Sequence, residues 1–315
     1  MDPLDTGHVG RRVVVRRVVG TADGRPRYAD TLGELVAADA THLVVRPDRG
    51  GPDARIARAD ITAAKPVPPR RHRAGTGELQ RIGARTWPAV ETAPLGDWLL
   101  RASDGWTRRA NSVLAVGDPG TPLAAAVDTV TAWYAARGLP PLAQLADGEA
   151  DDLDALLADR GWPAEASTLL LTAPISRVCA AATAGALPPV TFAAEPSADW
   201  LALFGARKGV SAAARTVLTG GDTTFAEVRG DGGELAAIGR GATADGHLLV
   251  AAVEVVPAYR RRGLARHLMA ALADRHTDRA HTVFLQVEDD NTAARTLYDR
   301  LGFRLHHAYH YRVAP

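Results

Sequence analysis

The sequence predicts an α+β protein in which a small all-β domain precedes two similar units of mixed strands and helices. Three observations lead to this fold class. Residues 8–69 contain only short strand-like segments. Residues 98–172 and 223–303 then pass through strands, a loop, a helix, a strand and a second helix in the same order. Finally, Gly161-Trp162 and Gly302-Phe303 end the second helix of the two series.

The composition is that of a globular protein with room for two or three domains. The chain has 315 residues, of which 46% are hydrophobic and 23% charged, and its formal net charge is +1. This balance gives no basis for bulk attraction to nucleic acid or membranes. The single cysteine, Cys179, allows neither an internal disulfide nor a cysteine-based zinc site. Met1–Asp5 lacks the pattern of a signal peptide and no run is apolar enough to span a bilayer, so a cytoplasmic location is expected.

The first predicted domain covers residues 1–72. Short strands at 12–19, 31–37, 43–46 and 54–61 are separated by Gly, Asp and Pro turns, which favours a small SH3-like barrel. The segment 65–71 is rich in proline and is predicted to be a linker. The arginines of the first strand could form a nucleic-acid patch, but the balanced charge favours a solvated strand pair; these are Arg11, Arg12, Arg16 and Arg17.

The second predicted domain covers residues 73–176. Trp98–Ser103 and Trp106–Val116 are expected to form a hairpin around Asp104-Gly105. Helices are expected at 123–137 and 149–160, with strands at 142–145 and 168–172. The hairpin residues Trp106, Arg108, Arg109 and Asn111 are candidates for one wall of a substrate cleft, although an outward-facing hairpin is an equal alternative.

The third predicted domain, residues 177–315, contains the most informative loop. Arg260–Ala265 connects an apolar strand, 248–256, to a helix that begins at about Leu264. The first turn of a helix leaves backbone N–H groups unpaired and carries partial positive charge, which suits a diphosphate. Gly263 allows close approach of an anion, and three arginines add charged donors; these are Arg260, Arg261 and Arg262. The alternative is a basic surface turn.

A second helix follows at about 291–301. Asn291, Ala294, Leu297 and Tyr298 share one face at helical spacing. A tyrosine on such a face is usually a half-buried core residue. Here it follows a phosphate-type loop by two elements, which makes a catalytic role plausible.

These two segments resemble the cofactor and second motifs of the GNAT superfamily of acetyl-CoA-dependent N-acetyltransferases. The first is Val255–Ala265, with Ala265 where a Gly is frequent, and the second is Leu285–Glu288 with the helix up to Gly302-Phe303. The resemblance implies tandem GNAT-like lobes, each a mixed sheet flanked by helices. The loop 117–123 carries no arginine, and Leu157 aligns with Tyr298, so the first lobe is predicted to be a degenerate copy.

The resemblance also implies the roles of individual residues. Acetyl-CoA would bind with its pantetheine arm against the backbone of Val253 and Val255, and the amide of Val255 would face the thioester carbonyl. Tyr298 would act as the general acid for the leaving thiolate. The remaining cofactor contacts would come from Val256, Arg260, Arg261, Arg262, Gly263, Leu264, Ala265, Asn291 and Ala294.

The general base and the acceptor contacts are less well determined by the sequence. An alkylamine has a pKa of about 10, so a group must remove its proton. Glu254 lies in an apolar strand, and alternation directs its side chain away from those of Val253 and Val255. A rim carboxylate is the alternative role, and Glu288 is a weaker candidate. Lone cations could bind an acidic acceptor or be merely solvated; these are Lys208, Arg207, Arg215 and Arg109.

The function expected from the sequence is acetyl transfer from acetyl-CoA to a primary amine by direct attack in a ternary complex. The whole-chain plan resembles a GNAT group associated with acetylation of the α-amine of glutamate or of protein lysine. A non-catalytic module that binds acetyl-CoA or a partner protein is the alternative of another class. No metal is expected, because His306, His307 and His310 alternate along a strand. Neither a membrane nor nucleic acid is an expected partner, and monomer or homodimer is left open.

Overall fold

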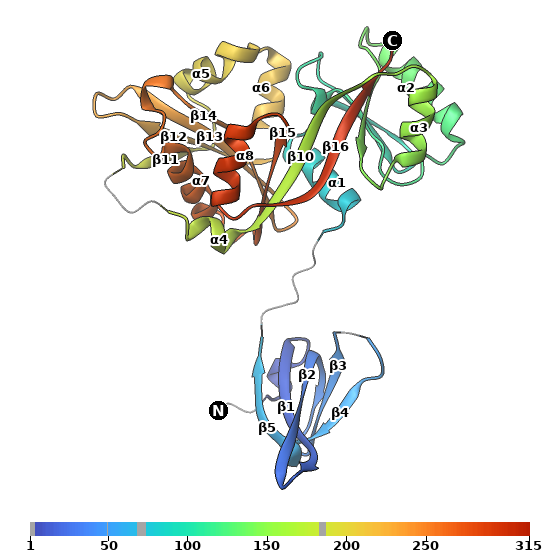
Figure 1. Cartoon of the computed structure of the whole chain (residues 1–315), viewed down its shortest axis with the longest axis vertical. Coiled ribbons are helices and arrows are strands. Elements are labelled where there is room, and N and C mark those ends of the chain that lie inside the picture. Colours follow the sequence, from blue (N-terminus) through green and yellow to red (C-terminus); the bar gives the residue numbers. More distant parts are fainter. Residues whose placement is uncertain (1–3, 49, 68–73, 183–186) are drawn as a thin grey trace. The chain divides into compact units, whose positions relative to one another are not determined.

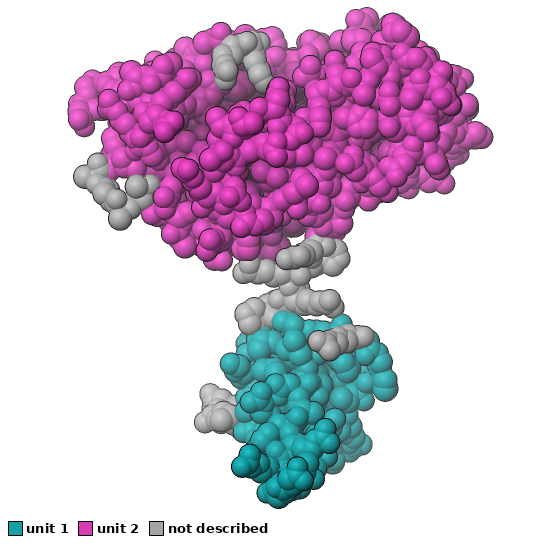
Figure 2. Space-filling model, in the orientation of Figure 1, with its two compact units in different colours: residues 1–73 teal, residues 74–315 magenta. Residues whose placement is uncertain are grey.

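The computed structural model describes residues 4–48, 50–67, 74–182 and 187–315. The chain forms two compact units, Met1–Arg73 and Ala74–Pro315 (Figure 2). No described helix has the length and apolar character needed to cross a membrane.

The first unit is a five-stranded antiparallel sheet in the order β4-β3-β2-β1-β5. Inward side chains of alternating strand residues form its core, including Val13, Val15, Leu43 and Ile56. Its elements are η1 (Thr6–His8), β1 (Arg12–Ala22), β2 (Arg25–Ala38), β3 (His42–Pro47), β4 (Ala54–Ala57), η2 (Arg58–Asp60) and β5 (Ile61–Pro66).

Two predictions for this unit are wrong. The single strand expected at 54–61 is interrupted by η2, because residues 58–60 form a 3₁₀ turn. Lys65 and Pro66, which were expected in the linker, belong to β5 and pair with Val14 and Val13 of β1. Residues 68–71 of the predicted linker lie outside the described residues. The SH3-like barrel stays a prediction, since the strand order alone shows a sheet.

The second unit contains one 11-stranded sheet in the order β11-β12-β13-β14-β15-β10-β16-β9-β8-β7-β6. This confirms the α+β class. In its N-terminal part the elements are α1 (Thr76–Thr86), β6 (Glu91–Leu95), β7 (Trp98–Ala102), η3 (Arg108–Ala110), β8 (Val113–Leu114), α2 (Leu123–Ala135), β9 (Leu142–Ala146), α3 (Asp151–Asp159), β10 (Ala164–Pro174) and α4 (Ile175–Cys179). The remaining elements are β11 (Val190–Ala193), α5 (Ala198–Lys208), α6 (Ala212–Thr219), β12 (Asp222–Arg229), β13 (Leu235–Ala244), β14 (His247–Val255), η4 (Pro257–Tyr259), α7 (Leu264–Arg275), β15 (Thr282–Glu288), α8 (Thr292–Arg300) and β16 (Arg304–Val313).

The two predicted lobes share this sheet through an exchange of strands. β10, which ends the predicted first lobe, lies between β15 and β16 of the second, with Leu170 opposite both Gln286 and His307. β16 in turn pairs with β9, with Tyr311 opposite Gln144. Figure 1 shows β10 and β16 running side by side between the two halves. The backbone hydrogen bonds of the sheet therefore continue from one lobe into the other, and a boundary between residues 176 and 177 stays a prediction.

The predicted hairpin at 98–116 is wrong in its second half. Only Val113–Leu114 forms a strand, and residues 103–111 fold into a loop that contains η3. Asn111 holds this loop: its Oδ1 accepts from the amides of Ser103 and Gly105, and its Nδ2 donates to the carbonyls of Trp106 and Thr107. Four bonds from one side chain replace the ladder that a hairpin would have provided. α1 and β6 were not predicted.

Helices cover the C-terminal half of this sheet on both faces (Figure 1). On one face, which we call the α7 face, α4, α7 and α8 pack on β12–β15 through a core that includes Val178, Leu268 and Leu285. On the other, the α5 face, α1, α5 and α6 form a core that includes Trp200 and Phe225. Side chains alternate between these cores along each strand.

A buried polar contact under α1 predicts a pH-dependent stability. The side chain of Gln80 contacts Nε2 of His307 at 2.8 Å, and Nδ1 of His307 lies 2.7 Å from Nδ1 of His306. Burial, with a smaller effect of His306, lowers the pKa of His307 to about 4. Because the folded-state pKa lies below the unfolded value, the unfolded chain takes up the proton first. This stability is complete above pH 6.5 and is lost as the pH falls towards 4.

We expect the wild type to lose about 3 kcal/mol of unfolding free energy over this range from His307 alone. Carboxylates also titrate in this pH range, so the measurement compares the pH dependence of the unfolding free energy in two proteins. Urea unfolding at several pH values should give a shallower pH dependence for His307→Gln than for the wild type. Parallel curves would contradict the assignment.

Candidate active site

The two parallel strands β14 and β15 separate within the sheet. They pair only at His247–Thr282, Leu248–Val283 and Leu249–Phe284, although β14 continues to Val255 and β15 to Glu288. Beyond Leu249, the facing backbone edges of β14 and β15 do not pair with each other. We call the space between these edges the strand gap. Such an edge presents backbone donors and acceptors to any extended group that enters it.

A bulge in β14 lies at the opening of the strand gap. Ala252 has φ 52°, and the register with β13 shifts between Ile238 and Arg240. After the bulge, the amide of Val256 donates to the carbonyl of Ala236 at 2.9 Å. Because ladder bonds alternate, Glu254 bonds to β13 while the amides of Val253 and Val255 point towards the gap. The predicted backbone donors therefore lie on its edge. The sequence did not reveal the bulge, since alanine has no preference for positive φ.

The loop after β14 has the features of an anion site. Arg261 and Gly263 both have positive φ, and Gly263 is the residue before the first turn of α7. The first helical bond joins the amide of His267 to the carbonyl of Gly263, which leaves the preceding amides of the turn without a partner within the helix. Leu264 is buried in the core and Ala265 is half-buried, so the cofactor contacts predicted for them would be made by the backbone.

The three arginines of this loop have different surroundings. Nε of Arg260 donates to the carbonyl of Val255 at 3.1 Å, and the guanidinium of Arg262 lies 5.2 Å from the ring centre of Tyr259. All three side chains are exposed. They add positive charge around unpaired amides, which is the chemistry that binds a diphosphate.

Tyr298 lies on α8 and packs against the α7-face core, with its ring 5.9 Å from that of Phe303. Its hydroxyl makes no hydrogen bond with the described residues. Burial raises the pKa of Tyr298, so the phenol is protonated at neutral pH. A neutral phenol with a free hydroxyl can donate a proton to a leaving group.

Asn291 has a structural role at the start of α8, and its contact with the cofactor stays a prediction. Its Oδ1 accepts from the amide of Ala294 at 3.1 Å and caps the N-terminus of α8. Its amide nitrogen is the part of the side chain that could contact a cofactor. Ala294 is half-buried on the side of α8 that faces the core.

The two candidate bases lie on the other face of the sheet. Glu254 is half-buried and pairs across the ladder with Ile238, whose side chain belongs to the α5-face core. On β15, Phe284 lies in the same core, so alternation also places Glu288 on this face. Glu288 is exposed and forms an ion pair of 3.8 Å with Arg108. The two carboxylates thus flank the strand gap on the face opposite Tyr298.

The predicted acceptor-binding cations are distributed unevenly. Arg109 lies on the α5 face, with its guanidinium 5.0 Å from the ring centre of Trp87. Arg215 is exposed on α6. The side chains of Arg207 and Lys208 lie outside the described residues.

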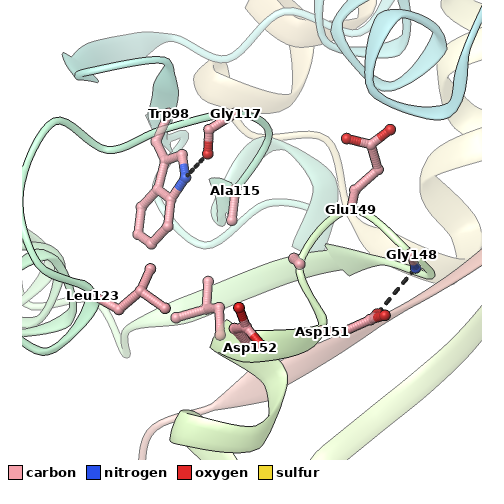
Figure 3. A pocket seen from close by; sticks show the side chains of 10 residues that line it. Trp98, Ala115, Gly117, Leu123, Gly148, Glu149, Asp151 and Asp152 are labelled. Atoms are coloured by element: carbon pink, nitrogen blue, oxygen red, sulfur yellow. Dashed lines mark hydrogen bonds between the residues drawn. The ribbon is translucent and has the colours of Figure 1, made fainter.

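The first lobe has a pocket at the position that corresponds to the strand gap. Its lining comes from the segments that follow the parallel strands β8 and β9 and from the beginnings of α2 and α3 (Figure 3). Its polar lining includes the carboxylates Glu149, Asp151 and Asp152, and it has no basic side chain. Two of the lining residues are joined by a hydrogen bond, in which Nε1 of Trp98 donates to the carbonyl of Gly117 at 3.0 Å. A diphosphate would be repelled by these carboxylates, which supports the prediction of a degenerate copy.

No group of three or more His, Cys, Asp or Glu side chains in the described part of the chain could hold a metal ion. The histidines of β16 have other partners: Nε2 of His306 contacts the carbonyl of Ala74, and Nε2 of His310 contacts Asp154. Each is thus part of the packing around the strand.

Comparison with known proteins agrees with this geometry. A family model described as the C-terminal region of the probable histone acetyltransferase Rv0428c matches residues 76–312. The uncharacterized N-acetyltransferase YobR of Bacillus subtilis (strain 168) is 26% identical over 243 residues, which cover 75% of this chain and 97% of YobR. The probable histone acetyltransferase Rv0428c of Mycobacterium tuberculosis (strain ATCC 25618 / H37Rv) is 33% identical over 137 residues, 42% of this chain and 43% of that protein.

Two solved structures share the fold. A GCN5-related N-acetyltransferase from Kribbella flavida superposes with a TM-score of 0.58 at 20% identity, covering 77% of this chain and 97% of that one. A tandem GNAT protein from the clavulanic acid biosynthesis pathway gives a TM-score of 0.52 at 13% identity, covering 77% and 89%. GNAT acetyltransferases generally use acetyl-CoA. The chain therefore belongs to the family of the Rv0428c C-terminal region, and it is a two-lobed N-acetyltransferase of the GNAT superfamily.

Proposed function

We propose that this protein transfers the acetyl group of acetyl-CoA directly to a primary amine within a ternary complex. The observation that carries the proposal is the strand gap, with the amides of Val253 and Val255 on its edge and the arginine-rich loop at its end. A pantetheine arm has amide groups that can pair with such an edge. The diphosphate would then reach the N-terminus of α7.

The catalytic groups lie on the two faces of the sheet beside this gap. The amine nitrogen attacks the thioester carbon, the carbon–sulfur bond breaks, and the thiolate takes a proton from Tyr298. The amide of Val255, or of Val253 beside the bulge, stabilises the oxyanion of the tetrahedral intermediate. Glu254 accepts the proton of the amine, directly or through water. Because Tyr298 lies on the α7 face and Glu254 on the α5 face, acid and base act from opposite sides of the thioester.

The acceptor is a small amine, such as the α-amine of glutamate, or a protein lysine. The name of the Mycobacterium tuberculosis relative, a probable histone acetyltransferase, favours lysine. The α5 face, where Arg109 lies, favours a small acidic amine. A non-catalytic module is not supported, since both curated relatives are named acetyltransferases.

Calorimetric titration with acetyl-CoA tests the cofactor site. Gly263→Val places side-chain atoms next to the unpaired amides at φ 84° and should weaken binding by about ten-fold or more, the loss of one good phosphate contact. Gly138→Val is the matched control, because Gly138 has φ 64° and no atom within 4 Å of its added Cβ. It should show a comparable loss of thermal stability from backbone strain and unchanged affinity. Failure of the wild type to bind acetyl-CoA would refute the proposal.

A further inference from the structure

The charge of the chain is divided unequally between its two compact units. Residues 1–73 contain 14 Lys and Arg against nine Asp and Glu, whereas residues 74–315 contain 23 Lys and Arg against 27 Asp and Glu. The formal net charges are therefore +5 and −4, and the whole-chain value of +1, which argues against a nucleic-acid partner, conceals a basic first unit. A local excess of positive charge attracts polyanions even where the rest of a chain is acidic.

The first unit extends a two-stranded ribbon beyond the other strands of its sheet (Figure 1). Among the described strands, β5 pairs with β1 only as far as Arg17, and β3 pairs with β2 only from Gly33 onwards. Residues 18–28 pair with each other and with no other described strand, and we call them the β1–β2 ribbon. Asp23 and Gly24 at its tip both have positive φ, as in the two-residue turns that suit the twist of a hairpin.

Three arginines share one face of this hairpin. Successive side chains of a strand alternate, so Arg25 and Arg27 of β2 point to the same side as Ala29. Arg17 at the base of the ribbon lies opposite Ala29 in the register of β1 and β2, and directly opposed residues share a face. The register shift in β1 comes after Arg17 and leaves this arrangement unchanged. These three, which we call the ribbon arginines, therefore form a row along one face.

The ribbon arginines form no ion pair within the part of the chain that the structure describes. Arg25 and Arg27 are exposed, and Nε of Arg17 is shielded from solvent without a hydrogen-bond partner in that part. On the opposite face, by contrast, Arg16 makes two hydrogen bonds of 2.8 Å to the carboxylate of Asp30. The positive charge of the hairpin is thus neutralised on one face and concentrated on the face of the ribbon arginines.

We propose that the β1–β2 ribbon binds double-stranded DNA in the major groove, through contacts of the ribbon arginines with backbone phosphates. The major groove of DNA is about 12 Å wide and admits a two-stranded ribbon, whereas that of duplex RNA is too narrow for side chains to read. A guanidinium carries donors that match phosphate oxygens. Phosphate contacts carry no base information, so the binding is independent of sequence. This inference goes beyond the proposed acetyl transfer and does not depend on it, because its residues all lie in the first unit.

The salt dependence of DNA binding tests the proposal. The probe is a fluorescently labelled DNA duplex of mixed sequence, titrated with the full chain at several salt concentrations and followed by anisotropy. Three arginines that each displace a counter-ion give a slope of about −3 for the logarithm of the affinity against the logarithm of the salt concentration. Arg25→Gln combined with Arg27→Gln should weaken binding and make this slope shallower by about 2. Both residues are exposed, so thermal unfolding of this variant should match that of the wild type.

Two double variants are the matched controls. Arg16→Gln combined with Asp30→Asn removes a neutral ion pair from the other face of the hairpin and should leave the affinity and the slope unchanged. Arg275→Gln combined with Arg300→Gln removes the same charge as the ribbon variant from exposed positions of the second unit, and it should also bind as the wild type does. An equal loss in this second control would mean that net charge drives binding, and it would overturn the role of the ribbon.

The remaining outcomes are equally decisive. If the wild type does not bind the duplex at low salt, or if the ribbon variant keeps the wild-type slope, the inference is overturned, and an acidic protein surface is left as the partner. An RNA duplex and a DNA single strand of the same sequence should bind more weakly than the DNA duplex. Equal or tighter binding of either would overturn the assignment to the major groove.

Discussion

Tyr298→Phe is expected to lower kcat for acetyl transfer by about 100-fold or more and to leave the affinity for acetyl-CoA unchanged. General acid catalysis typically contributes about 10²–10⁴-fold, and the substitution removes only the hydroxyl that would protonate the thiolate. The ring would keep its contact with Phe303, because that contact does not involve the oxygen. The effect should be measured as coenzyme A thiol release, with calorimetry for cofactor binding.

The pH dependence separates this role from a packing role. Burial raises the pKa of Tyr298, so ionisation of the phenol should give the wild type a loss of activity at alkaline pH. The residual activity of Tyr298→Phe should lack that limb. Equal turnover in both proteins would exclude Tyr298 as the acid and would leave water to protonate the thiolate.

Among the proposed substitutions, Arg240→Met is expected to lower the free energy of unfolding most. Arg240 is fully buried on β13, and its guanidinium donates to the carbonyls of Leu218 at 2.7 Å, Thr86 at 3.0 Å and Gly220 at 3.1 Å. It therefore joins the ends of α1 and α6 to the sheet. Methionine fills much of the volume but leaves three carbonyls without this donor, so the free energy of unfolding should fall by at least about 3 kcal/mol.

Arg229→Met is the matched control on the neighbouring strand β12. Arg229 forms ion pairs with Asp199 at 3.0 Å and Glu227 at 2.9 Å near the surface, where water can replace the lost charge. Denaturant unfolding of both variants should show a much smaller loss for Arg229→Met. Similar losses would mean that the carbonyl contacts of Arg240 contribute little net stability. The reason would be the cost of burying its charge, which also lowers the pKa of Arg240 to about 9.

Features that depend on a few consecutive residues could be predicted from the sequence. The glycine before α7 and the tyrosine on α8 follow from turn and helix patterns within a few residues, and the structure places Gly263 in the left-handed conformation at a helix start. Prediction failed where a distant or single polar contact decides the conformation. Asn111 replaces a hairpin ladder by four side-chain bonds, and η2 interrupts a strand that looks continuous in sequence.

The sequence by itself determined the family motifs, the arginine-rich loop and the alternation that sends Glu254 and the flanking valines to opposite faces, because these depend on backbone periodicity and on neighbours along the chain. Only the tertiary structure decided the exchange of β10 and β16, the separation of β14 from β15, the bulge at Ala252 and the contact of Arg109 with Trp87. Strand register and cross-lobe packing join residues far apart in the chain, and their energies come from contacts that no local pattern encodes.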